Sequence, residues 1–245
     1  MSRPDLALFA HVVGRGEDDF DVARAALLIA EPEYPSLDIP HYIALLDQLG
    51  GRARRALEGV EPGVLSARRL LGYLYEELGF RGNDTDYYDP RNCFINEVLD
   101  RRTGIPISLA IVLTEVARRA SVPAQGVSFP GHFLVRVPVD GGIVVIDPFQ
   151  GQLLTAEELR GLYQSATGRD EDPDPRLLAP AGSRQILLRI LTNLRSIYAK
   201  RVDIERLRAV IERMAVLAPG DRDLLRELER LGGELPPAPG DHGRN

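Results

Sequence analysis

The sequence predicts an α+β fold in which a small antiparallel sheet is flanked by helical regions on its N-terminal and C-terminal sides. Apolar residues recur at helical spacing before residue 80 and again from residue 184, whereas residues 125–147 alternate with a period of two. The composition agrees, because 44% hydrophobic and 27% charged residues in a chain of 245 are typical of a globular protein with a sizeable core.

Three helices are expected in the N-terminal region, over residues 19–29, 37–57 and 64–78. The second is expected to break or bend at Gly50-Gly51, because glycine weakens the interior of a helix. Gly79 follows the third helix and is its expected C-cap.

Residues 81–92 (RGNDTDYYDPRN) are rich in Asn, Asp and Gly, and this composition predicts a polar turn segment. A short helix should open at Arg91 or Asn92. A longer helix should begin at Pro106, whose missing N–H would be unpaired at that position anyway, and it should run to about Ala120.

Three short runs, GVSF, HFLVRV and GIVVID, are rich in β-branched and aromatic residues and are bounded by turn residues. They are expected to be adjacent antiparallel strands, the last two joined by a hairpin around residues 140–142. Thr155 should then cap a helix that carries Glu157 and Glu158 in its first turn.

Helices are also expected over residues 185–200, 203–217 and 221–231, with Asp203 and Asp221 as N-caps. Their spacing approximates one and a half units of a tetratricopeptide-type helical array. The expected organisation is an N-terminal helical region packed on the core (1–80), a core (81–165), a linker (166–183), tetratricopeptide-like helices (184–235) and a disordered tail (236–245).

Charge and cysteine content exclude several functions. Thirty basic and 36 acidic residues give a net charge of −6, which argues against nucleic acid or an anionic membrane as a partner. The single cysteine, Cys93, allows neither an intrachain disulfide nor a cysteine-based zinc site. No phosphate-binding glycine loop or metal-ligand cluster is present, so we expect no cofactor and no metal. No apolar run has the length and pattern of a secretion signal or a membrane span, so we expect a soluble cytoplasmic protein. The low content of Lys and the high contents of Arg, Ala and Gly suggest a bacterial source.

Three polar residues stand at positions suited to chemistry. Ser108 lies in the first turn of a predicted helix, where the helix dipole favours a nucleophile. His132 starts one predicted strand and Asp147 ends the next, so the carboxylate can lie beside the imidazole and fix its tautomer.

The stretch GIPISLAIVLTEVARRASVPAQGVSFPGHFLVRV, with VVIDPFQG after it and NDTDYYDPRNCFINEVLDRRT before it, resembles the SirB-type branch of the transglutaminase-like superfamily. The resemblance covers roughly residues 60–160, and members of that branch often append tetratricopeptide-type helices. It implies the papain-like α+β core of transglutaminases.

The resemblance also implies roles for individual residues. His132 in GHFLVRV matches the superfamily's catalytic histidine, and Asp147 in IDPF matches its catalytic aspartate. GIPISLA sets Pro106 where the superfamily keeps its nucleophilic cysteine. Proline offers no nucleophile, and this departure argues against ordinary thiol acyl transfer.

Two other residues are candidate nucleophiles, each with a structural alternative. Ser108 is either an alternative nucleophile or a first-turn residue whose hydroxyl bonds the backbone of its helix. Because Ser108 is two residues after Pro106 on a helix, its side chain should point away from His132 if Pro106 faces that histidine. Cys93 is the second candidate unless it is a buried small apolar residue.

Five residues are candidates for binding substrate. Tyr87, Tyr88, Asp89 and Asn92 form either the rim of a cleft or simply a turn with a helix cap. Arg136 shares a strand face with His132, and it either binds a carboxylate or pairs with a surface acid.

Two functional hypotheses follow. The first is a transglutaminase-like protein without the usual cysteine that acts as a peptide-binding, protein-binding or regulatory module. The alternative is a hydrolase or acyltransferase on amide or ester bonds, with His132 as base, Asp147 as orienting residue, and Ser108 or Cys93 as nucleophile. The sequence does not specify the oligomeric state.

Overall fold

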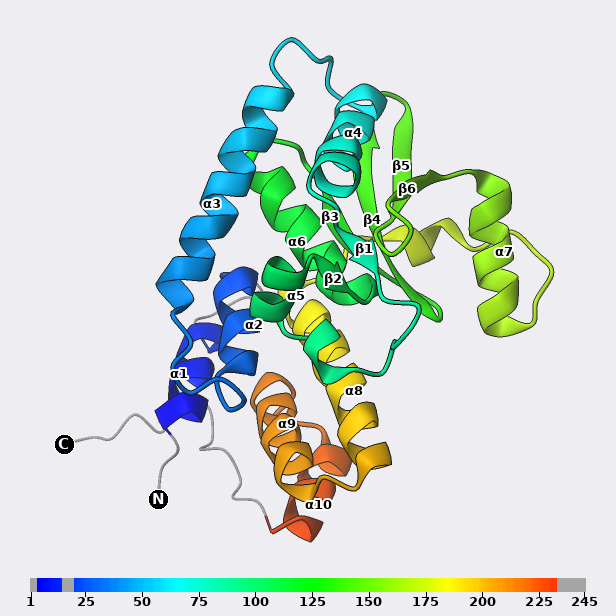
Figure 1. Ribbon diagram of the computed structural model, residues 1–245. Helices are drawn as coiled ribbons and strands as arrows, with labels where there is room; N and C mark the ends of the chain where they lie inside the picture. Colours follow the sequence, from blue (N-terminus) through cyan, green and yellow to red (C-terminus); the bar gives the residue numbers. More distant parts are fainter. Residues whose placement is uncertain (1–3, 15–19, 233–245) are drawn as a thin grey trace.

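The computed structural model describes residues 4–14 and 20–232. It has the predicted α+β architecture, with a small sheet between helices (Figure 1). The N-terminal helices are α1 (Pro4–Val13), α2 (Val22–Ala30), α3 (Ile39–Ala56) and α4 (Val64–Leu71), the last continued by a π-helical turn (Gly72–Glu77). Gly79 follows with φ +76°, the left-handed conformation expected at the end of a helix.

Helix α3 continues through Gly50 and Gly51, so the predicted break is wrong. The reason is tertiary. A Cβ atom on Gly50 would lie 2.2 Å from Cβ of Arg119 on α6 (Pro106–Arg119), whereas one on Gly51 would meet nothing within 4 Å. Gly50 therefore lets two helices approach closely, and their packing maintains a helix that local propensity alone would weaken.

Residues 125–154 form a four-stranded antiparallel sheet in the order β3-β4-β5-β6. Its strands are β3 (Gln125–Phe129), β4 (His132–Val139), β5 (Gly142–Asp147) and β6 (Gln152–Leu154). The first three strands and their hairpin were predicted, but β6 was not. A two-stranded parallel pair, β1 (Arg81–Gly82) with β2 (Thr103–Gly104), was also not predicted.

The two faces of the sheet are covered by different helices (Figure 1). Phe133, Val135 and Val137 of β4 belong to the main core together with the residues of α6. Leu134 belongs to a second, smaller core with Tyr163 of α7 (Ala156–Thr167). Since alternate residues of a strand share a face, His132 lies on the α7 side of the sheet.

The predicted caps around the sheet are present. Helix α6 begins at Pro106, and α7 begins after Thr155, whose side chain forms a reciprocal capping box with Glu158. The shorter helical segments are a 3-10 turn (Pro90–Asn92), α5 (Ile95–Arg101) and a second 3-10 turn (Pro175–Leu178).

The C-terminal helices are α8 (Ser183–Arg201), α9 (Ile204–Leu217) and α10 (Arg222–Arg230). Asp203 and Asp221 cap α9 and α10 as predicted. Helix α8 packs on α2, α6 and β3, so a single main core runs from the N-terminal to the C-terminal helices. The predicted tail, 236–245, lies outside the described residues. Among the helices that are described, none combines the length and apolar character needed to cross a membrane.

Candidate functional site

His132 and Asp147 are in direct contact. Nε2 of His132 lies 3.0 Å from Oδ1 of Asp147. The strand register explains the contact. Val135 of β4 pairs with Ile146 of β5, so the next pair along the antiparallel ladder places Leu134 opposite Asp147. His132 lies two residues before Leu134 on the same face and is therefore the diagonal neighbour of Asp147. Because a carboxylate only accepts, the contact assigns the hydrogen to Nε2 and leaves Nδ1 with the lone pair in the neutral ring.

The carboxylate of Asp147 is also held by the backbone that follows it. Its Oδ1 atom also accepts the N–H of Phe149 at 2.7 Å and that of Gln150 at 3.3 Å. The side chain of Asp147 is buried, with 6% exposed, whereas the side chain of His132 is 18% exposed. The pair therefore has a fixed buried acceptor and a more accessible imidazole.

Tyr75 supports the turn that holds Asp147. Its hydroxyl donates to the carbonyl of Pro148 at 2.6 Å, and its ring lies where a Cβ atom on Gly151 would be, 2.3 Å from that position. Burial and the negative charge of Asp147 both raise the pKa of Tyr75, so it remains a neutral hydrogen-bond donor. Sequence analysis missed Tyr75, because it comes from the π-helical turn after α4 and no local motif links it to Asp147.

Ser108 is not placed to act as a nucleophile. It is completely buried, and its hydroxyl donates to the carbonyl of Asn92 at 2.6 Å. It also accepts the N–H of Ile105 at 3.1 Å, which is the capping arrangement of the first turn of α6. The alternative backbone-bonding role is therefore what the structure shows. Within the described residues, no hydrogen bond joins Ser108 to His132.

Cys93 is also unsuited to nucleophilic attack. It is 1% exposed and belongs to the main hydrophobic core. Burial raises the pKa of its thiol strongly, and the charge of Asp89 raises it further. Because the thiolate is the reactive form, a buried thiol of raised pKa is inert near neutral pH. The structure thus gives Cys93 the role of a small apolar residue.

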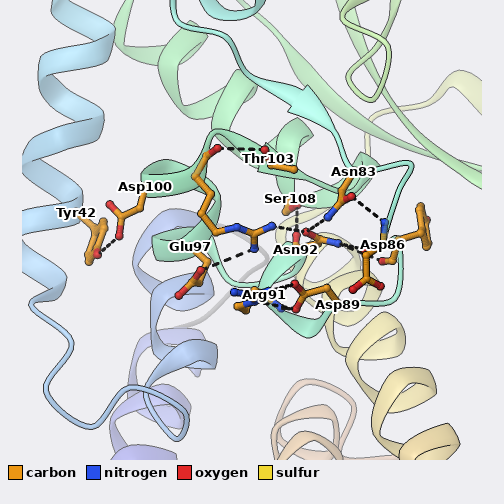
Figure 2. A network of polar contacts seen from close by, with 12 residues as sticks. Tyr42, Asn83, Asp86, Asp89, Arg91, Asn92, Glu97, Asp100, Thr103 and Ser108 are labelled. Carbon is orange, nitrogen blue, oxygen red and sulfur yellow. Dashed lines mark hydrogen bonds and ion pairs between the residues drawn. The ribbon is translucent and has the colours of Figure 1, made fainter.

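Asn92 joins several neighbouring segments by hydrogen bonds and is not part of a cleft rim. It is fully buried, and its amide nitrogen donates to the carbonyl of Asp86 at 2.7 Å. Its amide oxygen accepts from Asn83 and from Arg101 (Figure 2). With its hydrogen-bonding groups engaged inside the protein, Asn92 holds the 83–92 loop against α5 and α6 and does not reach a substrate.

The other predicted binding residues of this loop divide into two kinds. Asp89 is buried, caps the 3-10 turn and pairs with Arg91 at 2.7 Å, which lowers the pKa of its carboxyl despite burial (Figure 2). Tyr87 and Tyr88 are exposed, by 38% and 55%. The ring of Tyr87 packs against Phe149 with centroids 6.1 Å apart, which connects the loop to the turn whose backbone N–H groups hold Asp147.

Arg136 lies on the same sheet face as His132, as the alternation predicts. Its Nη1 donates to the backbone carbonyl of Leu178 at 3.0 Å, and this contact ties β4 to the second 3-10 turn. The predicted pairing with a surface acid is not seen among the described residues. Nor does any group of three or more His, Cys, Asp or Glu side chains in the described ranges gather as a metal site would require.

The chain belongs to the transglutaminase-like superfamily, whose sequence profile matches residues 40–192. A UPF0162 protein of Xylella fastidiosa strain Temecula1 is 43% identical over 227 residues, which cover 91% of this chain and 80% of the relative. UPF0162 protein PA3419 of Pseudomonas aeruginosa is 34% identical over 176 residues, covering 72% of this chain and 64% of that protein. F-box only protein 21 of the mouse is 37% identical over 142 residues, covering 54% of this chain and 21% of that protein. No solved structure matches the chain significantly.

Proposed function

We propose that this chain is a transglutaminase-like protein that has lost the catalytic cysteine, with Pro106 in its place, and that it binds a peptide or protein segment at the surface around His132. One observation carries the proposal. The His132–Asp147 pair is formed and partly accessible, while both alternative nucleophiles, Ser108 and Cys93, are buried and engaged elsewhere. A base without a nucleophile can still recognise a ligand through hydrogen bonds, because no hydrogen bond from the described residues occupies Nδ1 of His132.

We further propose that the protein is a bacterial cytoplasmic member of the SirB-type branch. In this proposal α8, α9 and α10 are tetratricopeptide-type helices. Short turns join these helices, and each packs on the next. Since α8 also contacts α2 and α6, the helices would extend the binding surface of the core and not form a separate body.

A displayed random-peptide library tests the binding function. We expect the folded chain to select a recurring peptide pattern and His132→Ala, checked for unchanged melting temperature, to lose it. A His41→Ala variant, which changes an exposed histidine remote in sequence from the pair, serves as the control. Selection of the same peptides by His132→Ala at equal affinity would overturn the proposed site.

The hydrolase or acyltransferase alternative makes a different prediction. If the chain turned over a panel of amide or ester substrates, and either Ser108→Ala or Cys93→Ala abolished that turnover without unfolding the protein, the pair would belong to an enzyme. We expect no turnover, because neither Oγ of Ser108 nor Sγ of Cys93 is accessible to a substrate carbonyl.

A further inference from the structure

A patch of exposed aromatic and aliphatic side chains lies where the 83–92 loop meets the end of α8. We define the tyrosine surface as Tyr87 and Tyr88 of the 83–92 loop with Lys200, Arg201 and Val202 at the end of α8. Nζ of Lys200 lies 4.1 Å from the ring centroid of Tyr88, and Arg201 donates to the carbonyl of Tyr88 at 3.2 Å. Tyr88 is 55% exposed and Val202 74%. Exposed apolar groups gathered in one place are typical of an interaction site.

A chain of contacts links the tyrosine surface to the candidate site. The ring of Tyr87 packs on Phe149 and on Tyr88, with centroid distances of 6.1 and 5.4 Å. The backbone N–H of Phe149 donates to Asp147, which in turn contacts His132. A Cβ atom on Gly82 would lie 2.6 Å from the ring of Phe149, so the absence of a side chain there makes room for the ring. Through these contacts the 83–92 loop packs on the turn that holds Asp147.

The charges on this surface are positive where α8 approaches the tyrosines. Arg189, Lys200 and Arg201 form no ion pair with a carboxylate within the described ranges. Burial raises the pKa of the Tyr87 hydroxyl, and the positive charge of Arg189 opposes that rise. Tryptophan, tyrosine and arginine are enriched among the residues that carry binding energy at interfaces, and a positive patch attracts acidic ligands.

The backbone of Val202 gives a second indication. It adopts φ +55°, a left-handed conformation that usually falls to glycine at the end of a helix and is rare for a β-branched residue. Its side chain is held in solvent at the edge of the tyrosine surface. This conformation ends α8, because the N–H groups of Val202 and Asp203 donate to the carbonyls of Ala199 and Tyr198. The apolar side chain of Val202 is left exposed by it, and a partner that covered this residue would bury that side chain.

We propose that the tyrosine surface binds an acidic peptide segment of a partner protein, in which an aromatic or aliphatic residue lies between acidic residues. The apolar residue would pack on Tyr87, Tyr88 and Val202, and the carboxylates would contact Lys200 and Arg201. This inference rests on the proposed peptide-binding function and names the chemistry of the ligand.

A peptide fits this surface better than a nucleic acid does. Single-stranded nucleic acid also stacks on aromatic rings beside cations, but it carries a negative charge at every phosphate. Asp84 and Asp86 are exposed on the same loop, and the chain as a whole has a net charge of −6. A peptide can place its carboxylates at α8 and its neutral residues beside Asp84 and Asp86.

Fluorescence anisotropy with the full chain tests the proposal. The probe is a short fluorescein-labelled peptide with glutamates on both sides of a Phe-Leu pair. Control peptides replace every Glu by Gln, every Glu by Lys, or Phe-Leu by Ser-Ser. We expect the acidic probe to bind at least about tenfold more tightly than each control, because charge and apolar contact both contribute.

Variants locate the binding. Lys200→Glu and Tyr88→Ala should each weaken binding of the acidic probe by about tenfold. Arg222→Glu makes a charge reversal on an exposed position of α10 and should leave the affinity within about twofold. Melting temperatures of all variants establish that they are folded.

Several outcomes would overturn the inference. Equal binding of the Gln peptide, or no effect of Lys200→Glu, excludes recognition of acidic residues. Tighter binding of a single-stranded RNA oligonucleotide than of the probe assigns the surface to nucleic acid. A concentration-dependent dimer that Tyr88→Ala disrupts assigns it to a second copy of the chain. If the displayed library instead selects non-acidic peptides that depend on His132, the inference fails while the proposed binding function stands.

Discussion

The Nε2 atom of His132 lies 3.0 Å from Oδ1 of Asp147, and that same oxygen accepts the backbone N–H of Phe149. One carboxylate thus performs two tasks: it orients the imidazole and it closes the turn after β5. The local stability of the site and the orientation of His132 therefore depend on the same buried side chain.

Replacement of Asp147 tests how this side chain stabilises the turn. Asp147→Ala leaves the N–H groups of Phe149 and Gln150 without their acceptor, which should cost about 1–3 kcal/mol of the free energy of unfolding. Asp147→Asn keeps an amide oxygen for both donors and should cost less. Urea unfolding of the two variants measures the difference. An equal loss in both would show that the negative charge, and not the acceptor, stabilises the turn.

A matched pair of glycines tests the contact with Tyr75. Gly151 and Gly141 have φ +69° and +80°, so alanine is strained by a similar amount at either position, roughly 1–2 kcal/mol. Only at Gly151 would the new Cβ atom also strike the ring of Tyr75, since nothing lies within 4 Å at Gly141. We expect Gly151→Ala to destabilise by about 1–3 kcal/mol more than Gly141→Ala in thermal unfolding. Similar melting temperatures for the two variants would contradict the packing of Tyr75 on this turn.

The adjacent glycines of α3 should respond to substitution with opposite signs. Gly51→Ala adds a good helix former where nothing lies within 4 Å, and it should stabilise the protein by about 0.5–1 kcal/mol. Gly50→Ala forces a Cβ atom onto Arg119 and should destabilise it by about 1–3 kcal/mol. Chemical unfolding checks both signs. Stabilisation by both substitutions would mean that α3 and α6 are not in close contact at Gly50.

Tyr42 should contribute to the loss of stability at alkaline pH. Burial, together with the hydrogen bond to Asp100 and the charge of that carboxylate, raises the pKa of Tyr42 to about 12. Because the pKa is near 10 in the unfolded chain, this contribution is complete below about pH 10 and is lost as the pH rises through about 12. Tyr42→Phe cannot ionise, so its stability should fall less steeply between these values. Urea unfolding at a series of pH values measures both slopes, and parallel profiles would refute the assignment.

The site was predictable to the extent that it is built from neighbours along the chain. His132 and Asp147 belong to strands joined by a tight hairpin, so a period of two and a turn signal were enough to place them together. Ser108 was harder to predict, because two roles are compatible with its position in a first helical turn. The carbonyl of Asn92, 16 residues away, decides between them by accepting its hydroxyl.

The sequence by itself determined the α+β class, the three main strands, the start of α6 at Pro106 and the caps at Thr155, Asp203 and Asp221. Each of these depends on the order of residues within about one turn or one hairpin. Only the tertiary structure decided the continuity of α3 at Gly50, the burial of Asn92 and Cys93, and the support of Asp147 by Tyr75. These features depend on groups far apart in the sequence, whose contact is set by close packing of the whole core and not by local propensity.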